Sequence, residues 1–535
     1  MDENPVVEAK KPSGKGRIFY PVLFAIFPVL SIYSANLSLV PFGMIIRPVV
    51  AVAIAAFLVW GLLSLILRRL DRGAAATAAL TLMLLTFVGF NRLLYRIDIP
   101  QDIRPNVWLG TTIVVVLVSA FVWRWHKLLN IVSASLVLAA IGQIAFGLVQ
   151  AATFSPPKTT NSTPITLPKE RPDIIYIILD GYGRSDALKR AMGFNNDAFI
   201  QGLESRGFYV AKDAHSNYCQ TELSVSSSLN FDLLQSLLPN LNDEDNDRSP
   251  LGELIDHNAA ADYLHKRGYV FAAITSKFPP IQLDDADINM KTRTGYTLIE
   301  SALLQMTPFT LFQGNLTSLF DQRRATMRNE FEALESLAST SAKPRFVVMH
   351  VLAPHPPFVF DKDGNPTRRE GPFGYWDGSD FIDHVGTPED YRQGYMGQAE
   401  YVGKRLLKSL DVLFAKPGLK PVVIVQGDHG SKLRLDQNSY EHTDVDECFP
   451  NLNAYFVPDA VRKNLYPGIT PVNSFRILFN GLFGDNLPLR PDRSWYSTYP
   501  KPYDFIEVTN RLSNHEKMPT VPLPKFPPRP PAGDD

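Results

Sequence analysis

Asp428 and His429, two residue types that bind metals, stand directly after an apolar run at residues 422–427. Far upstream, a second apolar run at residues 174–179 ends in Asp180. Such runs are typical of buried strands in a parallel sheet, and ligands of open α/β sheets bind at the carboxyl ends of the strands. Carboxylate oxygens with one imidazole suit zinc or manganese better than an iron–sulfur cluster or a purely calcium site. The sequence therefore predicts a divalent metal site at this edge.

A hydroxyl that could serve this site as a nucleophile lies within residues 217–230. Leu223 and Leu229, with the apolar residues that follow, predict a helix that begins near Thr221. At a helix amino terminus, the backbone N–H groups and the dipole favour an alkoxide or a phosphoryl oxygen, and a bound divalent ion lowers the hydroxyl pKa further. We therefore expect Thr221 to be the nucleophile. In the alternative interpretation, Thr221 only caps the helix.

Strand-like apolar runs alternate with helical patterns after residue 171, which predicts an α/β domain with a mostly parallel central sheet and helices on both faces. The expected elements are strands at residues 172–180, 269–274, 345–350 and 421–426 and helices at 259–268 and 474–483. Because the candidate metal ligands end two of these strands, the sheet is the element that must bring them together.

The first 154 residues contain apolar stretches that lack Asp, Glu, Lys and Arg. These stretches are residues 18–40, 48–67, 74–90, 107–123 and 129–149. Each is near the length that crosses about 30 Å of hydrocarbon at about 1.5 Å per residue. Buried helices of a soluble domain are the alternative, but they would leave too much apolar surface for the few polar segments to cover. We therefore expect a transmembrane domain of five helices before the α/β domain.

Basic residues set the expected orientation of these five helices. One side of the helices is flanked by more basic residues than the other. The first side has Lys10, Lys11, Lys15, Arg17, Arg68, Arg69, Arg72, Arg124 and Lys127, and the second has Arg47, Arg92, Arg96 and Arg104. The positive-inside rule makes the first side cytoplasmic, so the chain after residue 154 lies outside the cytoplasm. The first stretch has no small-residue cleavage site and is expected to be an anchor, not a removable signal peptide.

The expected domains are a cytoplasmic N-terminus (1–17), a transmembrane domain (18–153), a proline-rich linker (154–171), an extracytoplasmic catalytic domain (172–517) and a proline-rich tail (518–535). Within the catalytic domain, the apolar residues 309–320 either rest on a lipid surface or pack against the domain, and we expect the second. The formal net charge is −1. Without a block of basic residues, we expect no nucleic-acid partner.

The two cysteines, Cys219 and Cys448, lie in the part of the chain expected outside the cytoplasm. An oxidising compartment there permits a disulfide between them. Each stands a few residues from a candidate site residue, so the two sulfurs could lie close together. Two unpaired, buried thiols are the alternative, and the sequence leaves both open.

The arrangement of Asp180, Thr221 and the pair Asp428-His429 resembles the alkaline phosphatase superfamily in its sulfatase-like branch. It is most similar to the five-span membrane enzymes that include phosphoethanolamine transferases and lipoteichoic acid synthases. The motifs cover roughly residues 171–485, and the layout covers the whole chain. The resemblance implies a metal ion held by all four side chains, and a threonine that attacks phosphorus to form a covalent intermediate.

The resemblance also places histidines around the substrate phosphate. Residues 349–357 look like the family's histidine loop after a strand, which implies that His355 and His350 contact phosphate or protonate the leaving group. His442 follows the Asp-His pair at the spacing where the phosphoethanolamine transferases carry another histidine. A structural role is the alternative for each of the three.

Two features depart from the family pattern. Sulfatases proper need a cysteine or serine in a Cys-x-Pro-x-Arg context, which the sequence around Cys219 lacks, so sulfate ester hydrolysis by that route is disfavoured. Asp180 stands where the closest transferases often carry glutamate. This second departure leaves the transferred headgroup and its acceptor open.

We expect a metal-dependent enzyme in the cytoplasmic membrane of a bacterium, with its catalytic domain in the periplasm or outside the cell. It would move a phosphate-linked headgroup from a phospholipid donor to an envelope glycan or lipid acceptor, with Thr221 and one zinc or manganese ion. One alternative is a hydrolase of the same fold, a phosphodiesterase, phosphatase or sulfuric ester hydrolase, in which water replaces the acceptor. The other is a non-catalytic, membrane-anchored binding protein.

Overall fold

The computed structural model describes residues 17–37, 42–100, 102–121, 123–152, 170–290, 297–312, 319–339, 341–367 and 373–512. The expected N-terminus, linker and tail therefore lie almost wholly outside the described residues. The chain divides into two compact units. Unit 1 comprises residues 1–37, 41–149 and 298–313, and unit 2 comprises residues 38–40, 150–297 and 314–535.

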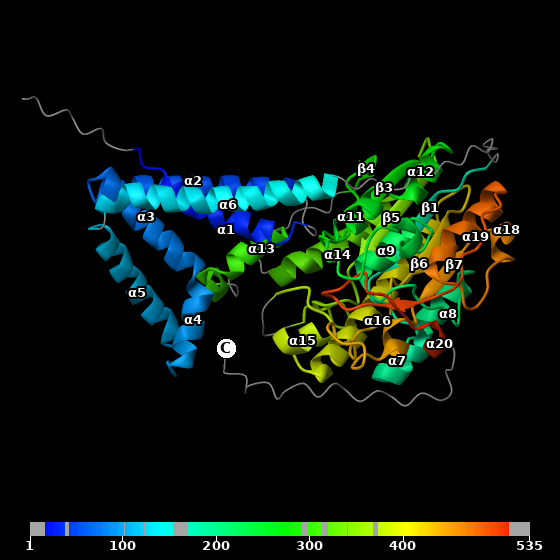
Figure 1. Cartoon of the computed structure of the whole chain (residues 1–535). Helices are drawn as coiled ribbons and strands as arrows, with labels where there is room; N and C mark the ends of the chain where they lie inside the picture. Colours follow the sequence, from blue (N-terminus) through cyan, green and yellow to red (C-terminus); the bar gives the residue numbers. More distant parts are fainter. Residues whose placement is uncertain are drawn as a thin grey trace, which may run out of the picture. The chain divides into compact units, whose positions relative to one another are not determined.

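Unit 1 is built from helices (Figure 1). In its first 149 residues they are α1 (Tyr20–Ser34), α2 (Gly43–Ile66), α3 (Leu70–Leu85), α4 (Phe87–Arg96), α5 (Arg104–Ser119), the short 3-10 helix η1 (Trp123–Trp125) and α6 (His126–Ala152). Each of the five apolar stretches falls on one or more of these helices. The pairs α1 with α2, α2 with α3 and α3 with α5 pack against each other.

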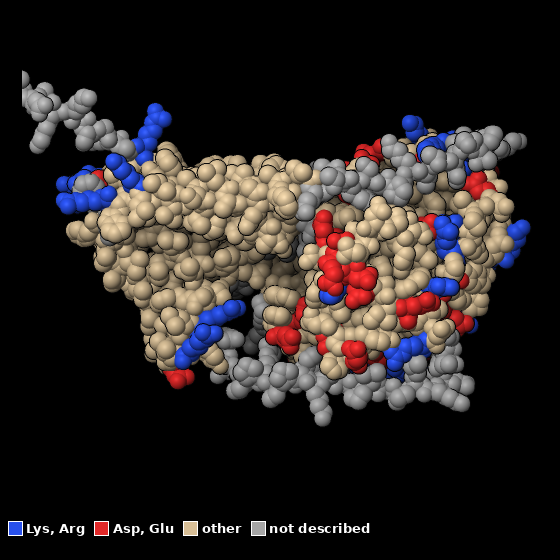
Figure 2. All heavy atoms as spheres, in the orientation of Figure 1, with Lys and Arg blue, Asp and Glu red and all other residues tan. Residues whose placement is uncertain are grey.

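Only α2 and α6 are single helices long and apolar enough to cross a membrane, among the residues that the structure describes. The helices α3 and α4 would make a third span if taken together, but they are bent by 61° at Thr86. The apolar helices α1 and α5 are shorter. In Figure 2 the face of unit 1 is almost free of charged side chains between its ends, which fits a hydrocarbon environment. The number of crossings is thus two or three by length and composition, and five remains a prediction.

A segment from the later part of the sequence also belongs to unit 1. The helix α13 (Leu298–Gln305) packs against α1 and α2, and the 3-10 helix η2 (Pro308–Phe312) packs against α13. Arg47 near the start of α2 forms an ion pair with Glu300 of α13. The expectation that residues 309–320 pack against the catalytic domain is therefore wrong for residues 309–312. It holds for Phe320, which packs against the core of unit 2.

Unit 2 contains a seven-stranded sheet with the order β2-β7-β6-β1-β5-β3-β4. Its strands are β1 (Ile174–Leu179), β2 (Tyr209–Val210), β3 (Val270–Ile274), β4 (Ile288–Asn289), β5 (Arg345–Val351), β6 (Val422–Gln426) and β7 (Asn453–Phe456). The pairings among β6, β1, β5, β3 and β4 are parallel, and β7 runs antiparallel to both β6 and β2. The mostly parallel sheet predicted from the sequence is confirmed. A separate hairpin joins β8 (Trp495–Tyr496) and β9 (Ile506–Glu507).

Helices cover both faces of this sheet, because its strands are apolar on both sides. Ile175, Ile177 and Leu179 of β1 pack in one cluster with α7 (Ser185–Met192), α8 (Asp197–Ser205), α14 (Leu319–Ser336) and α16 (Pro388–Phe414). Ile174, Tyr176 and Ile178 pack on the other face with α9 (Thr221–Leu229), α11 (Ser249–Asp256), α12 (Ala259–His265) and α19 (Pro471–Phe483). The remaining short helices are α10 (Leu234–Leu237), α15 (Ser379–His384), α17 (Val445–Cys448), α18 (Asp459–Arg462) and α20 (Thr509–Leu512).

The register of the three central strands fixes where the candidate site lies. Ile178 of β1 is paired with His350 of β5 on one side and with Gln426 of β6 on the other. Asp180 and Asp428 both lie two residues beyond this row. Parallel pairing therefore delivers both carboxylates to the same edge of the sheet.

The packing of α13 on α2 predicts a cross-link within the full chain. In the variant Arg47→Cys/Glu300→Cys, a short bismaleimide reagent is expected to join the two helices, since the native side chains form an ion pair. The matched control is Arg69→Cys/Glu300→Cys, because Arg69 lies beyond the other end of α2, about 30 Å away at 1.5 Å per residue. Mass spectrometry of the digested protein counts the joined peptides. Equal yields from the two variants would contradict the docking of α13.

Candidate metal site and nucleophile

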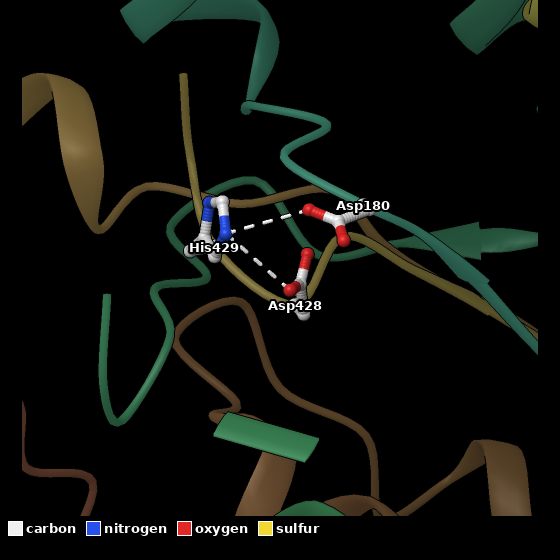
Figure 3. A group of neighbouring side chains, drawn as sticks. All are labelled: Asp180, Asp428 and His429. Atoms are coloured by element: carbon white, nitrogen blue, oxygen red, sulfur yellow. Dashed lines mark ion pairs between the residues drawn. The ribbon is translucent and has the colours of Figure 1, made fainter. Parts of the chain in front are cut away.

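Asp180, Asp428 and His429 converge at the carboxyl edge of the sheet (Figure 3). The Nε2 atom of His429 lies 3.5 Å from Oδ1 of Asp180 and 3.4 Å from Oδ2 of Asp428. One ligand atom from each of the three residues lies within 4.8 Å of the other two. All three side chains are buried. The structure thus brings together the three residues that the sequence placed at two strand ends.

The hydrogen bond of His429 decides which of its ring nitrogens faces the carboxylates with a lone pair. Its Nδ1 lies 2.7 Å from the carbonyl oxygen of Gly430, and because a carbonyl can only accept, Nδ1 carries the proton. Burial, with the positive charge of Lys432, holds the pKa of His429 well below its usual range. The ring is therefore neutral, and Nε2 presents a lone pair to Asp180 and Asp428.

The carboxylates contribute two unpaired acceptor atoms that a cation could bind. The Oδ1 of Asp180 and the Oδ2 of Asp428 are buried and have no hydrogen-bond partner among the described residues. The other oxygen of Asp428 accepts a hydrogen bond of 2.8 Å from the backbone N–H of Gly181. Burial and the nearby Asp428 raise the pKa of Asp180 well above its usual value. These unpaired atoms fit one divalent ion such as zinc or manganese, which would neutralise both carboxylates.

Glycines let the backbone make this close approach. Gly181, directly after Asp180, has a φ of +73°, a conformation that other residues rarely adopt. A Cβ at Gly430 would lie 2.1 Å from the carbonyl oxygen of Glu447. The loop after His429 can therefore turn only because residue 430 has no side chain.

Thr221 lies beside the same imidazole. Its Oγ1 is 3.2 Å from Nε2 of His429, and it is the first residue of α9, as the sequence predicted. The start of α9 is held against the strand end, since the hydroxyl of Ser224 donates to the carbonyl of Asp428 over 2.6 Å. The hydroxyl of Thr221 therefore contacts one of the three candidate metal ligands, and its own place among the ligands of a metal ion stays a prediction.

His350 and His355 also lie at this site, but their contacts differ. His350 is buried on β5, with Nε2 3.2 Å from Oδ2 of Asp180 and Nδ1 2.7 Å from the hydroxyl of Ser276. Burial lowers the pKa of His350 to about 4, so the ring is neutral, and its Nε2 forms a hydrogen bond with Asp180. These contacts turn Oδ1 of Asp180 toward His429. A contact between His350 and substrate stays a prediction.

His355 lies in the loop that follows β5, four residues after Val351. Its backbone N–H donates to the carbonyl of Asp180 over 3.0 Å, and its Nδ1 lies 2.5 Å from the carbonyl of Pro356. This leaves Nε2 facing Oδ2 of Asp377 at 3.6 Å. His355 therefore presents one ring nitrogen to the carboxylate of Asp377, and its role in proton transfer stays a prediction.

The structure does not bring His442 into this group. Its side chain is 67% exposed, and its Nδ1 lies 3.4 Å from Oδ2 of Asp436. Among the described residues, no recorded ion pair or hydrogen bond joins it to Asp180, Thr221 or His429. Its role toward substrate stays a prediction that the geometry does not support.

Cys219 and Cys448 are two free, buried thiols that belong to the same apolar cluster. Burial raises the pKa of Cys219 to about 11 and also raises that of Cys448. Both thiols are therefore protonated and poor nucleophiles at neutral pH. A disulfide between them stays a prediction.

Two charged residues of the site escaped the sequence reasoning, namely Lys432 and Asp377. Lys432 is buried, with its Nζ 3.7 Å from Oδ2 of Asp377. Burial alone would lower the pKa of Lys432, but Asp377, Asp180 and Asp428 together raise it. Burial raises the pKa of Asp377, but the interactions with His355 and Lys432 together lower it by more. The carboxylate of Asp377 is therefore ionised. The one available signal was the position of Lys432, three residues after His429; nothing near Asp377 in the sequence marks it.

Comparison with solved structures finds sulfatases and phosphoethanolamine transferases, the kinds of enzyme that the sequence motifs resemble. The lipooligosaccharide phosphoethanolamine transferase A of Neisseria meningitidis, an integral membrane protein, is 11% identical, over 87% of this chain and 94% of its own, with a TM-score of 0.39. The zinc complex of the C-terminal periplasmic domain of EcEptC from Escherichia coli is 9% identical, over 64% and 94%, with a TM-score of 0.41.

A phosphonate monoester hydrolase of Agrobacterium radiobacter is 14% identical, over 61% of this chain and 80% of its own, with a TM-score of 0.40. No protein-family model and no curated protein matches the chain. Because these TM-scores are below 0.5, the geometry of the site carries the functional argument, and the likenesses do not.

The three candidate ligand atoms of Asp180, Asp428 and His429 predict that the purified chain holds about one zinc or manganese ion. The variants Asp428→Ala and His429→Ala are expected to lose it, because each removes one of three ligand atoms that lie within 4.8 Å of one another. His442→Ala is the control and should keep the metal. Elemental analysis of the three variants checks this. Full metal content in both Asp428→Ala and His429→Ala would contradict this prediction.

The pair of Lys432 and Asp377 predicts coupled effects on stability. Lys432→Met should lower the free energy of unfolding by about 3 kcal/mol, because it leaves the Asp377 carboxylate buried without this partner. In Lys432→Met/Asp377→Asn part of that loss should return, since no lone charge remains. Thermal unfolding of the wild type, both single variants and the double variant measures the coupling. Strictly additive losses would show that the two side chains act independently.

Proposed function

We propose that the chain is a metal-dependent membrane transferase that moves a phosphate-linked headgroup from a phospholipid donor to a hydroxyl of an envelope glycan or lipid, through a covalent intermediate on Thr221. One observation supports this most: the Thr221 hydroxyl contacts the same His429 nitrogen that faces two unpaired carboxylate oxygens. A structural threonine would not require these acceptors beside it. The arrangement suits an activated oxygen nucleophile.

Asp180, Thr221, Asp428 and His429 would hold the divalent ion. When bound, the ion supplies positive charge beside the hydroxyl and beside the nonbridging oxygens of the substrate phosphate. The amino terminus of α9 and the buried ammonium of Lys432 add to this positive field. The site is therefore complementary to a phosphodiester whose charge grows as it is attacked.

In the first step, the Thr221 oxygen forms a bond to phosphorus as its proton is lost to solvent. The bond from phosphorus to the diacylglycerol oxygen breaks, and His355 supplies the proton that this leaving oxygen needs. Oδ2 of Asp377 faces Nε2 of His355 at 3.6 Å and holds that ring in place. The headgroup and its phosphate then remain on Thr221.

In the second step, His355 takes a proton from the acceptor hydroxyl, whose oxygen attacks the same phosphorus. The bond to Thr221 breaks, and the threonine recovers a proton. Water in place of the acceptor would make the enzyme a hydrolase. The two reactions share every residue up to the intermediate, so the fate of the intermediate distinguishes them.

A lipid donor fits the apolar helices of unit 1, for which we propose five membrane crossings, with the N-terminus in the cytoplasm and the catalytic unit on the outer face of a bacterial cytoplasmic membrane. The ion pair of Arg47 with Glu300 supports this topology. Glu300 comes after the last apolar helix, so the start of α2 must lie at the same membrane face as the chain that follows α6.

The decisive experiment looks for the headgroup on Thr221. Protein purified from its native membrane is expected to carry a phosphate-linked adduct on this residue, and peptide mass spectrometry would give its mass. Thr221→Ala should remove both the adduct and at least about 1000-fold of the activity, since it removes the hydroxyl that contacts Nε2 of His429. Ser226→Ala, which removes a buried hydroxyl of the same helix, is the matched control and should retain both.

Transfer of the headgroup to an added lipid or glycan, against its release by water, separates a transferase from a hydrolase. Full activity in Thr221→Ala would sink the covalent mechanism. Absence of metal and of any phosphodiester cleavage in the wild type would indicate the non-catalytic binding protein.

A further inference from the structure

The residues on either side of Thr221 both lead to one buried arginine. The Nη2 of Arg248 donates to Oε1 of Gln220 over 2.7 Å, and its Nη1 lies 3.6 Å from Oε2 of Glu222. Arg248 is itself only 5% exposed. It precedes α11, which packs against the nucleophile helix α9. The guanidinium therefore holds both neighbours of the candidate nucleophile at once.

Arg248 is in turn fixed by the loop of residues 497–499. Its Nη2 also donates to the carbonyl of Tyr499 over 2.8 Å, and its guanidinium carbon lies 4.2 Å from the centre of the Tyr499 ring. Gln220 reaches the same loop, because its Nε2 donates to the carbonyl of Ser497 at 3.0 Å and to that of Thr498 at 3.2 Å. Arg248 and Gln220 thus both link the start of α9 to the loop of residues 497–499.

This use of Gln220 leaves the first turn of α9 open. Gln220 is the residue before the helix, where a side chain often accepts a hydrogen bond from the first turn, yet it makes no such bond. Its amide is engaged by Arg248 and by residues 497 and 498 instead. The first-turn N–H groups of α9 are therefore not capped by the Gln220 side chain and are available to an anionic group.

Arg248 also pairs with the carboxylate of Glu222. The Glu222 side chain is 9% exposed, so its carboxylate is buried one residue from a hydroxyl that would carry a phosphodiester anion. Two buried negative charges at this distance repel each other strongly unless a cation lies between or beside them. Arg248 is the positive partner of Glu222 in the structure. Its planar fork also fits Gln220 and Tyr499 at the same time, which a lysine ammonium could not do.

We propose that Arg248 is a positioning residue for Thr221: it sets the direction of the hydroxyl through Gln220 and offsets the charge of Glu222 when the phosphate is attached. This inference rests on the proposed covalent role of Thr221. Arg248 touches neither the reacting atoms nor the candidate metal ligands in its recorded contacts. Its effect should therefore fall on the rate of attack and not on metal binding.

The experiment uses the full-length protein in detergent or vesicles with a phospholipid donor. Arg248→Lys keeps the charge but loses the fork, and should slow formation of the Thr221 adduct about 10- to 100-fold, the usual worth of one or two charge-assisted hydrogen bonds. The KM for the donor and the bound metal should change less than about twofold, because neither depends on the angle of the hydroxyl. Adduct formation is followed by quenched-flow mass spectrometry of the Thr221 peptide.

Charge compensation has its own variants. Arg248→Gln should be slower than Arg248→Lys, since it leaves the Glu222 charge unopposed. Adding Glu222→Gln should restore part of the rate. A purely structural arginine would not give this rescue.

Arg267 offers a matched control. It is also buried, stacks on Tyr263 with its guanidinium carbon 3.5 Å from the ring centre, and pairs with Asp485 at 3.2 Å. Arg267→Lys removes the same kind of interaction away from α9 and should leave the rate of attack unchanged, even where it lowers the unfolding temperature.

The outcomes separate this inference from the proposed function. A wild type that forms the adduct, with Arg248→Lys as fast as Arg267→Lys, overturns the role of Arg248 and leaves the function standing. Loss of metal from Arg248→Lys, or no rescue by Glu222→Gln, overturns it as well. A wild type without any adduct or metal-dependent cleavage overturns the proposed function and the inference with it.

Discussion

The meeting of Oδ1 of Asp180, Oδ2 of Asp428 and Nε2 of His429 around one point is the constraint on which unit 2 depends. Each atom is an acceptor, none brings a proton, and all lie within 4.8 Å. All three side chains are buried, so a cation or protonation of a carboxylate would relieve the repulsion. The raised pKa of Asp180 expresses this repulsion. Binding of a cation should then stabilise the folded chain, because the unfolded chain offers no such group.

The sheet resists this repulsion through its central strands. β1 lies between β5 and β6, with parallel hydrogen bonds to both, and all three strands are buried on both faces. Asp180, His355 and Asp428 therefore emerge from backbone that cannot separate without breaking the core. The positive groups around them come from other elements: Lys432 from the loop after β6, and α9 through its amino terminus. With a cation bound at the negative centre, the positive groups around it would favour a phosphate ester.

The sequence was sufficient for the parts of the site that follow buried strands. Asp180, Asp428 and His429 are recognisable because an apolar run ends at them, and Thr221 because an apolar helical pattern begins there. Asp377, Lys432 and Arg248 lack such a marker. Asp377 reaches the site from a loop about 50 residues before His429, and no local pattern encodes that contact. The role of His442 stays a prediction: it came from the resemblance alone, and in the structure the side chain is exposed beside Asp436.

Long-range contacts also explain why residues 309–312 were misjudged. Their apolar character was evident, but η2 packs against α13, and the surface that α13 covers is formed by α1 and α2, about 250 residues earlier. An apolar pattern predicts that a segment is buried, but it does not identify the surface against which the segment packs. For the helices of unit 1, composition predicted five crossings. The bend at Thr86 and the shortness of α1 and α5 leave two or three by length and composition among the described residues.

The ion pair between Arg47 and Glu300 restricts how unit 1 can cross a bilayer. In the proposed topology both residues lie at one membrane face, so the chain makes an even number of crossings between them. The helices α2 and α6 are long and apolar enough for two such crossings. If the bent pair of α3 and α4 also crosses, the count becomes odd unless α5 crosses too. Hence α3–α4 and α5 either both span the membrane or both do not. The first case, with α1, gives the five crossings of the proposed topology and places the catalytic unit opposite an N-terminus that begins in the cytoplasm.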